Sequence, residues 1–466
     1  MFFFVFLLIQ KLIIKSNKMI KKNTNSHRFS FVNKRFFITF LFFSPISLFT
    51  FSPLLFLPFS AVAQPLTLSV CYEKTEQNYP LIRQLELIDL SEKYNLQNAS
   101  RTWIPQLQLF GKATLQSDAP SFEMDLTNLG LPINYGVDVP KDQYQAYLQL
   151  SQMIWDGGQI RSAKKTIQAS SEVQRKQNEV DLYALRGRVN ELFFGIILYD
   201  SQIEQINVNL KELQRNLEKV TNYKTLGFAN ESDIDAVKVE QLAAEQHIIQ
   251  LSTMREAFVA MLSAFMGEEL PPDISLQKPE IVLVQEINNR LELQLFDAFV
   301  EVQKIQNMQV LSKNMPKVGF FVQGGFARPG LNMFDTGGKL YAVGGLQLNW
   351  GFGNLYTIKN EKRIIENNIS NIEINRKVFL LNQTIQTKQQ NAIAEQYRKL
   401  LISDDEIIRM RETIYKASEA KTENGTMSIS DLMRDFNMEN AAKAQKIVHE
   451  IQYIKALYDL KNLYNN

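Results

Sequence analysis

Four segments of the chain alternate apolar and polar residues with a period of two. In each segment one face is apolar and the other carries mostly Gln, Lys, Thr or Asn; the segments are 106–116, 143–155, 317–326 and 339–349. Alternation of this kind predicts β-strands whose two faces meet different surroundings. The loops 117–142 and 327–338 join the segments in pairs. The pattern therefore predicts two β-hairpins, at about 105–156 and at about 316–351.

A long helical run follows the first hairpin. After Gly158 the apolar residues recur at alternating steps of three and four, which is the heptad pattern of a coiled coil. The run stops before Gly227, so the helix is about 100 Å long at 1.5 Å per residue. The residues of the predicted seam are Leu185, Val189, Leu192, Ile196, Tyr199, Ile203, Ile206, Leu210, Leu213, Leu217 and Val220.

A turn at about 223–233 separates this helix from a second one. The apolar positions of the second helix continue the seam, so the two helices are predicted to lie antiparallel. These positions are Val237, Ala244, Ile248, Leu251, Phe258, Leu262 and Phe265.

The second half of the chain repeats this order less regularly. Apolar residues recur every seven positions from Ile358 to Phe379, but Asn, Gln and charged residues crowd the rest of the helix up to Lys421. That composition fits either a helix that lines a water-filled space or an ordinary solvated outer face. A turn at about 421–431 and a return helix complete the half.

Each hairpin is also preceded by a helical stretch. The first covers about 69–102, with Pro80 as its start or a kink, and ends near Pro105. The second covers 284–313 and meets Pro316. Both halves are therefore predicted to contain a helix, a hairpin, a long helix, a turn and a return helix.

Two short motifs that align with each other support an internal duplication. The segment "GFANESDI" begins at Gly227 and "GTMSISDL" begins at Gly425, and they align without a gap. Ser232 then corresponds to Ser430, and Asp233 to Asp431. The sequence predicts two repeats, at 64–272 and 273–466.

The first 63 residues differ from the rest and read as a signal peptide. They hold basic residues, no acidic ones and a long apolar stretch, and they end in the small-x-small pattern of residues 61–63. Met19 can be the true start, because a complete basic leader follows it. The alternative is an uncleaved membrane anchor, against which the prolines within the apolar stretch argue.

Removal of this leader changes the charge of the chain. Of the 51 Lys and Arg, eight lie in the leader, which leaves 43 against 49 Asp and Glu, so the mature chain is near −6. An acidic excess argues against a nucleic-acid partner. Beyond the leader there is no run of 18 apolar residues, and no transmembrane helix is expected.

Residues for catalysis or metal binding are scarce. Cys71 is the only cysteine, so an intrachain disulfide is excluded. It could carry a lipid, but Val70 stands where a lipidation site needs a small residue. His247 and His449 are expected on helix surfaces, without metal-ligand spacing. The segment "GFGNLY" lacks the third glycine of a dinucleotide loop. We expect no enzyme, no metal and no cofactor.

The four strands suit a β-barrel wall in lipid, because each is about ten residues long with one apolar face. Four strands cannot close a barrel, and open edges are not tolerated in hydrocarbon, so the chain must assemble with copies of itself. Glycines at the ends of both hairpins would let the chain bend from strand to helix, and tryptophans there suit the membrane interface or simple core packing. The junction residues are Trp155, Gly157, Gly158, Trp350, Gly351 and Gly353.

The order of these features resembles the TolC family of outer-membrane efflux proteins, over residues 65–464. "IWDGGQ" is similar to the family's junction between second strand and long helix, and "YKTLGFANESDIDA" to its periplasmic turn. The resemblance implies an α+β membrane protein with long coiled-coil helices. Three chains would close a twelve-stranded barrel in the outer membrane and form a helical tunnel through the periplasm.

The resemblance also implies partners. A periplasmic adaptor (membrane fusion) protein and an inner-membrane pump of the RND, ABC or MFS type would dock at the closed tip of the tunnel. The pump supplies the energy and selects the cargo, so this chain would be a passive exit duct for drugs, metal ions, lipidic compounds or polypeptides.

Some site residues follow from the resemblance position by position. Asp431 matches the first of two aspartates that ring the tip in some members, where carboxylates favour cations. The second falls on Arg434, with Asp435 beside it, and the family's latching arginine falls on Met427. A double acidic ring is therefore not expected here, and the latch is either absent or made by other residues.

Helix capping is the alternative role at the turns. Asp233, Asp431, Ser232 and Ser430 could cap the return helices instead of forming a gate. Gly227 and Gly425 are expected to shape the turns on which an adaptor docks.

Two other classes of protein compete with the duct. A trimeric structural or adhesive coiled-coil stalk anchored in the outer membrane would explain the heptads, but it leaves the four strands without a role. A periplasmic hydrolase with helical arms would need a catalytic constellation that the sequence lacks.

Overall fold

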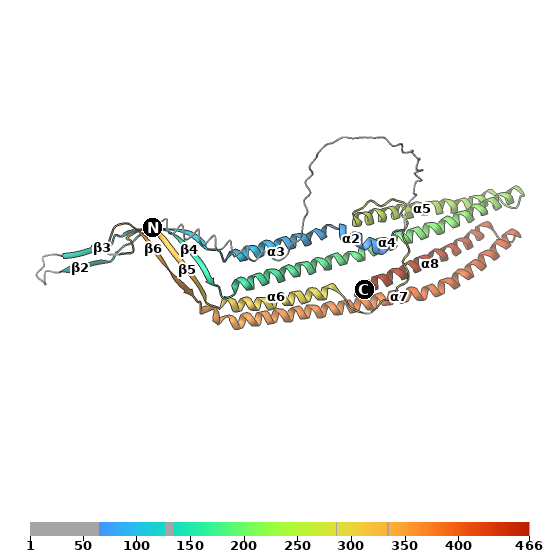
Figure 1. Ribbon diagram of the computed structural model, residues 1–466. Helices are drawn as coiled ribbons and strands as arrows, with labels where there is room; N and C mark the ends of the chain where they lie inside the picture. Colours follow the sequence, from blue (N-terminus) through green and yellow to red (C-terminus); the bar gives the residue numbers. More distant parts are fainter. Residues whose placement is uncertain (1–64, 126–133, 286, 333–334, 466) are drawn as a thin grey trace, which may run out of the picture. The chain divides into compact units, whose positions relative to one another are not determined.

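The computed structural model describes residues 65–125, 134–285, 287–332 and 335–465 (Figure 1). All of these residues belong to one compact unit, Ala63–Asn466. The signal peptide predicted at 1–63 lies outside the described residues.

Both halves of the chain contain a helix, a hairpin, a long helix and a return helix in the same order. The first half comprises α2 (Leu68–Asn78), η1 (Pro80–Ile82), α3 (Arg83–Arg101), β1 (Gln106–Leu115), β2 (Ser121–Asp125), β3 (Asn134–Asp138), β4 (Asp142–Trp155), α4 (Gln159–Thr225) and α5 (Glu231–Met266). The second half comprises α6 (Leu291–Lys313), β5 (Lys317–Arg328), β6 (Lys339–Asn349), η3 (Gly353–Tyr356), α7 (Ile358–Glu423) and α8 (Ile429–Tyr464). The long helices have 67 and 66 residues and the return helices 36 each, so their lengths match closely. The repeat boundary near residue 272 stays a prediction.

The structure differs from the predicted elements in the loop 117–142 and before α6. The loop 117–142 contains a small antiparallel pair, β2 and β3, whose five-residue strands are too short to give a clear period. The helix predicted from residue 284 begins only at Leu291. Arg290 is extended, and the residues before it bond elsewhere: Asn288 Nδ2 donates to Gln383 Oε1 at 2.8 Å, and Asn289 N donates to Tyr464 O at 2.9 Å.

The four long strands form one antiparallel sheet in the order β1-β4-β5-β6. Pairing of β4 with β5 joins the two predicted hairpins, so β1 and β6 are the edges. Because of the register, the apolar positions of neighbouring strands lie on the same side of the sheet: Leu109 pairs with Leu148, and Leu148 pairs with Gly324. A register shift between Met153 and Trp155 lies where β4 approaches its helix.

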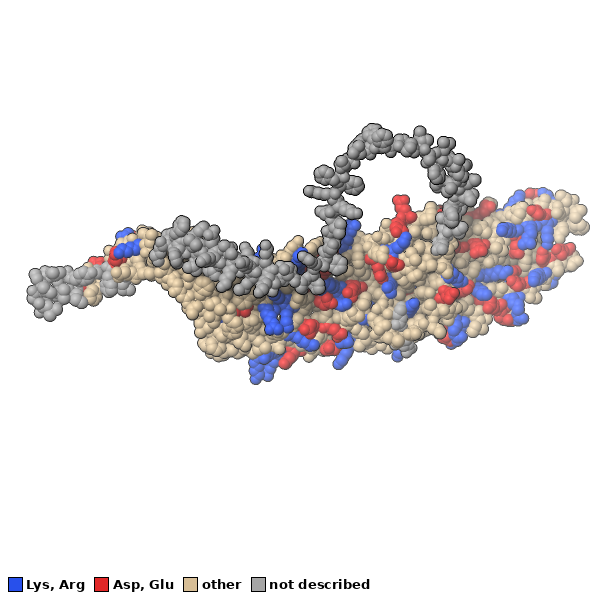
Figure 2. Space-filling view, in the orientation of Figure 1, with Lys and Arg blue, Asp and Glu red and all other residues tan. Residues whose placement is uncertain are grey.

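The apolar face of this sheet is the exposed one. Leu109, Leu148 and Leu346 are 75%, 50% and 77% exposed, whereas Gln145, Gln149 and Gln323 on the other face are half-buried. In Figure 2 charged residues cover the helices, while the visible surface over β5 and β6 is almost free of them. This distribution is the reverse of that in a sheet of a water-soluble protein.

The helices pack side by side around α4 (Figure 1). α2 and α3 lie against α4 together with α6, while α5 and α8 pack against it further along, and α7 pairs with α6 and then with α8. Every residue of the predicted α4 seam is buried or half-buried, as is every one in α5. Buried side chains form two clusters, one around Phe193 and Phe194 near the middle of α4, the other around Leu213 and Phe436 near the turns.

Among the described helices, α5 alone is long and apolar enough to cross a membrane by length and composition, with a mean hydropathy of 1.2 in its most apolar window. Length and composition are the only grounds for this, so the absence of a transmembrane helix stays a prediction. The same helix packs along α4 through its seam. Its apolar residues outside the seam, such as Val239 and Ile249, are exposed.

Cys71 lies in α2 within the cluster around Phe193, with none of its surface exposed. Burial raises the pKa of its thiol to about 12. The thiolate is the reactive form of cysteine, so both access and ionisation are suppressed.

We therefore expect the native protein to resist modification of Cys71 by a maleimide at pH 8, and the denatured protein to react fully within the same time. Mass spectrometry of the labelled chain measures this. Rapid labelling of the folded protein would contradict the burial of α2, and a lipid on the thiol would show as added mass.

Candidate functional site at the helical turns

The two turns that join long and return helices have the same backbone geometry. Gly227, two residues after the end of α4, has φ +81°, and Gly425, two residues after the end of α7, has φ +72°. A Cβ at either position would meet open space, so glycine is not needed there for lack of room. Glycine is favoured because the backbone is left-handed, a conformation that other residues rarely adopt. The amides that follow donate back to the helices, Phe228 N to Tyr223 O at 2.8 Å and Thr426 N to Lys421 O at 2.9 Å.

The return helices are capped two residues before the serines that the sequence pointed to. Asn230 caps α5: its Oδ1 accepts from Asp233 N at 3.2 Å, and Asp233 Oδ2 accepts from Asn230 N at 2.9 Å. Ser428 caps α8: its Oγ accepts from Asp431 N at 3.1 Å and donates to Asp431 Oδ2 at 2.7 Å. Asp233 and Asp431 thus belong to the caps.

Ser232 and Ser430, which aligned in the two motifs, are not the caps themselves. Ser232 Oγ donates to Asn230 Oδ1 at 2.5 Å, and Ser430 is exposed. The equivalent positions that do the capping are Asn230 and Ser428, and their side chains differ in type. A search for identical letters therefore passed over them.

The acidic residues of the second turn are paired within the chain. Arg434 Nη1 lies 3.0 Å from Asp431 Oδ1, and Arg434 Nε lies 3.8 Å from Asp435 Oδ1. Asp435 also accepts a hydrogen bond at 2.6 Å from Ser418 Oγ on α7. Of the two carboxylates, Asp431 is exposed and Asp435 is mostly covered, which leaves Asp431 as the accessible one.

A set of polar contacts near the turns joins α4 to α7, and we call it the clasp. Lys219 Nζ lies 2.5 Å from Glu419 Oε1 and 3.4 Å from Glu423 Oε1, and Asn216 Nδ2 donates to Tyr415 OH at 3.2 Å. The hydrogen bond to Glu419 raises the pKa of Lys219, and burial raises that of Tyr415. The clasp holds one helix pair against the other on the rim of the cluster around Leu213 and Phe436.

The sequence prediction missed the clasp. Lys219, Glu419 and Glu423 look like ordinary surface charges, because their partners are 200 or more residues away. Asn216 gave a signal that could have been used: it lies beside Leu217 in the predicted seam, and a polar side chain there must find a partner when buried.

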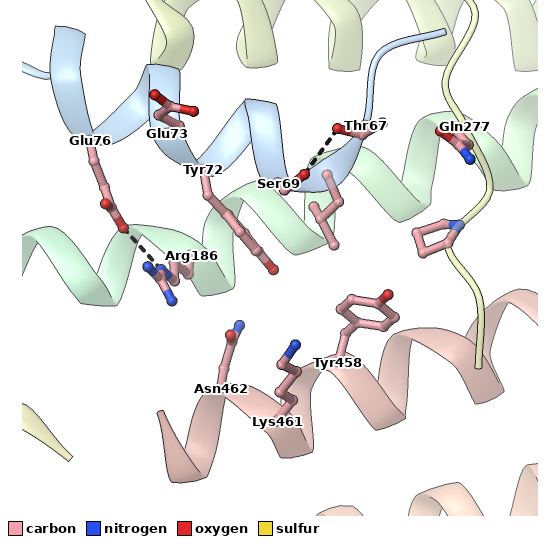
Figure 3. Close-up of a pocket in the computed structure, with 12 residues that line it drawn as sticks. Thr67, Ser69, Tyr72, Glu73, Glu76, Arg186, Gln277, Tyr458, Lys461 and Asn462 are labelled. Carbon is pink, nitrogen blue, oxygen red and sulfur yellow. Dashed lines mark hydrogen bonds and ion pairs between the residues drawn. The ribbon is translucent and has the colours of Figure 1, made fainter. Parts of the chain in front are cut away.

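A second polar network binds the helices together midway along α4. Arg186 Nε lies 2.9 Å from Glu76 Oε1, and the Arg186 guanidinium stands 5.3 Å from the Tyr72 ring. Figure 3 shows these residues around a cavity of about 480 Å³ with Tyr458, Lys461 and Asn462 of α8 on its other side. Asn190 Nδ2 on α4 also donates to Asp459 Oδ1 on α8 at 3.0 Å, so polar contacts tie both α2 and α8 to α4.

His449 was wrongly predicted to lie on a helix surface. It is buried between α8 and α7, where its Nδ1 lies 2.6 Å from Asp404 Oδ2. Its Nε2 lies 2.8 Å from Gln445 Nε2. Asp404 lies 45 residues away in the chain, so local spacing could not indicate the pair. His247 is exposed, as predicted.

The first strand-to-helix junction requires its glycines. Gly157 and Gly158 have φ +69° and +85°, and a Cβ on Gly157 would come within 2.6 Å of Met315 Cβ. Buried Asp156 caps α4, accepting from Gly158 N at 2.9 Å and from Ile160 N at 2.6 Å. Trp155, which ends β4, is exposed.

The second junction is built differently, so the expected equivalence of its glycines was wrong. Gly351 and Gly353 do not adopt the left-handed conformation, and a Cβ on either would meet open space. The short helix η3 lies between β6 and α7 at this junction. Trp350 is exposed like Trp155, and its Nε1 donates to Asn314 O at 3.1 Å.

No protein-family model matches the sequence, and no curated protein matches it. Solved outer-membrane channels have similar structures. The open-state MtrE outer membrane channel of Neisseria gonorrhoeae superimposes with a TM-score of 0.59 at 12% identity, over 86% of this chain and 89% of its own.

Two further solved channels also have structures similar to this chain. The Campylobacter jejuni CmeC outer membrane channel gives a TM-score of 0.57 at 11% identity, over 85% of each chain. The outer membrane protein VceC of Vibrio cholerae gives a TM-score of 0.55 at 12% identity, over 84% of this chain and 95% of its own. At such identities the likeness shows the fold, and the resemblance to TolC-family channels is confirmed at that level.

Proposed function

We propose that this chain, which shares the fold of the TolC-family outer-membrane channels, is one protomer of a passive exit duct in the outer membrane of a Gram-negative cell. The duct would serve a tripartite efflux system or a type I secretion system. The long helices would project into the periplasm.

The exposed apolar face of the sheet carries this proposal. Ten to fourteen residues per strand suffice to cross the hydrocarbon core when the strands are tilted. Leucines cover the outward positions of β1 and β6, and exposed Trp155 and Trp350 follow the sheet where an interface would lie. Water would disfavour such a surface, and lipid favours it.

The open edges of the sheet support assembly into a trimer. Unpaired backbone groups on β1 and β6 are costly in hydrocarbon, so each edge must meet another strand. Three copies give twelve strands, enough to close a barrel, and β1 of one copy would pair with β6 of the next. The exposed apolar residues of α5 and α7 would then lie against neighbouring helices.

The turns at Gly227 and Gly425 are the proposed docking points for a periplasmic adaptor and an inner-membrane pump. Phe228 is 82% exposed at the first turn, beside exposed Leu226. Large apolar side chains exposed at a turn suit a protein contact. The clasp would hold the tip closed until docking separates α7 from α4.

Conductance of the reconstituted mature protein in planar bilayers tests the duct. We expect discrete current steps, and larger steps when the clasp is broken. A trimer that never conducts, even with Asp431→Ala or a broken clasp, would contradict the duct and favour the stalk. Turnover of a substrate would favour a hydrolase, whereas the similar structures are channels.

A further inference from the structure

One level of the sheet carries aromatic residues on its polar face. Phe110 pairs with Tyr147, Tyr147 with Gly325, and Gly325 with Tyr341, so the four positions cross all four strands. The Phe110 and Tyr147 rings are stacked, with centroids 5.0 Å apart and planes 20° apart. We call Phe110, Tyr147 and Tyr341 the aromatic row.

The row is held in place yet remains accessible. Gln145 Nε2 donates to Tyr341 OH at 2.8 Å, which orients that ring. Gly325 allows β5 to approach β4 closely, since a Cβ there would lie 2.2 Å from Ala146 O. Phe110 lies on the edge strand β1, where nearly every residue is exposed, and is itself 38% exposed.

The same face is positively charged. Its inward positions include Lys112, Lys317 and Lys339, and no Asp or Glu occupies that face of the four strands. Lys339 pairs with Asp335, but Lys112, one level from the aromatic row, has no carboxylate partner among the described residues. On the other side of the row the residues are Gln108, Gln149 and Gln323.

We propose that the aromatic row and Lys112 form a binding site for flat aromatic anions inside the barrel. Ring faces stack on planar ligands, and an unpaired ammonium attracts their negative charge. The site rests on the proposed function for its place in the lumen, and it names a cargo class for that duct. It lies within the sheet of one protomer, so binding to it does not require conduction.

Titration calorimetry of the full mature chain, extracted in detergent, tests the site. The probes are 1-naphthalenesulfonate and cyclohexanesulfonate, which carry the same charge but differ in aromaticity. We expect the Phe110→Leu/Tyr341→Leu variant to weaken naphthalenesulfonate binding about tenfold. Cyclohexanesulfonate binding should not change. Subtracting the heat measured for the variant from that measured for the wild type removes the contribution of probe taken up by the detergent micelle.

Two conservative variants keep the test valid if the double variant fails to fold. Tyr341→Phe keeps the ring but loses the hydrogen bond from Gln145 Nε2, so it should bind naphthalenesulfonate more weakly than the wild type and more tightly than the double variant. Lys112→Gln should weaken the binding of naphthalenesulfonate. Binding of 1-naphthylmethylammonium should be unchanged or tighter. Equal affinity of wild type and double variant for naphthalenesulfonate would overturn the site, and an unchanged preference in Lys112→Gln would overturn its charge selectivity.

Failure of the site and failure of the duct are distinguishable. A trimer that conducts but shows no dependence on the aromatic row would refute the site alone. A particle that binds the probe through the row but never conducts would refute the duct and retain the site.

Discussion

Leu148→Arg is expected to abolish assembly of the protein in the outer membrane. Leu148 lies in the middle of β4 on the exposed apolar face, paired with Leu109. An arginine facing lipid near the bilayer centre costs about 2–4 kcal/mol, and a trimer would bear this cost three times. At an exposed site facing water the same change would stay within about 0.5 kcal/mol. Membrane fractionation with quantification of detergent-resistant trimer measures the outcome.

Gln149→Arg is the matched control. Gln149 is the next residue in the strand, faces the polar side and accepts a hydrogen bond from Gln323 at 3.2 Å. It receives the same new charge, and we expect normal assembly with altered ion selectivity. If Leu148→Arg assembled as well as Gln149→Arg, the apolar face would not contact lipid.

Lys219→Glu is expected to open the tip. The substitution replaces two attractions, to Glu419 and Glu423, with two repulsions. Exposed ion pairs contribute about 0.2–1 kcal/mol each, so we expect about 1–2 kcal/mol per protomer. Three protomers acting together would shift the closed-to-open ratio by about a hundredfold or more. Single-channel open probability in planar bilayers measures this shift.

The controls separate the clasp from charge alone. Arg215→Glu makes the same change one turn earlier on α4, where Arg215 is 69% exposed and, among the described residues, pairs only with Glu212 of its own helix, at 3.3 Å. We expect no change in open probability. Lys219→Glu combined with Glu419→Lys and Glu423→Lys should restore closure. If Lys219→Glu gated like the wild type, the clasp would not hold the tip.

Periodicity in the sequence predicted most of the fold. Alternation located all four long strands, and the heptad seam located α4 and α5, because each burial pattern is a local consequence of backbone geometry. The prediction failed where tertiary contacts override local pattern. Residues near Asn288 bond to α7 and α8 instead of extending α6, and Gly351 and Gly353 do not adopt the left-handed conformation of the glycines at the first junction.

The candidate site was harder to predict than the fold. The turn glycines follow from local backbone demands, and a capping role for Asp233 and Asp431 was one of two alternatives considered. The clasp depends on pairing between α4 and α7, and His449 meets Asp404 only through the packing of α8 on α7. Residue types alone do not indicate such distant pairs.

The most direct test of the account is the protein mass of the detergent-extracted, outer-membrane-derived particle, with the detergent contribution subtracted. Three chains per particle are expected, because the two open edges of each four-stranded sheet must pair with other copies and the resemblance to the TolC family implies a twelve-stranded barrel. A soluble monomer would contradict it, since the apolar face of the sheet would then be exposed to water rather than lipid.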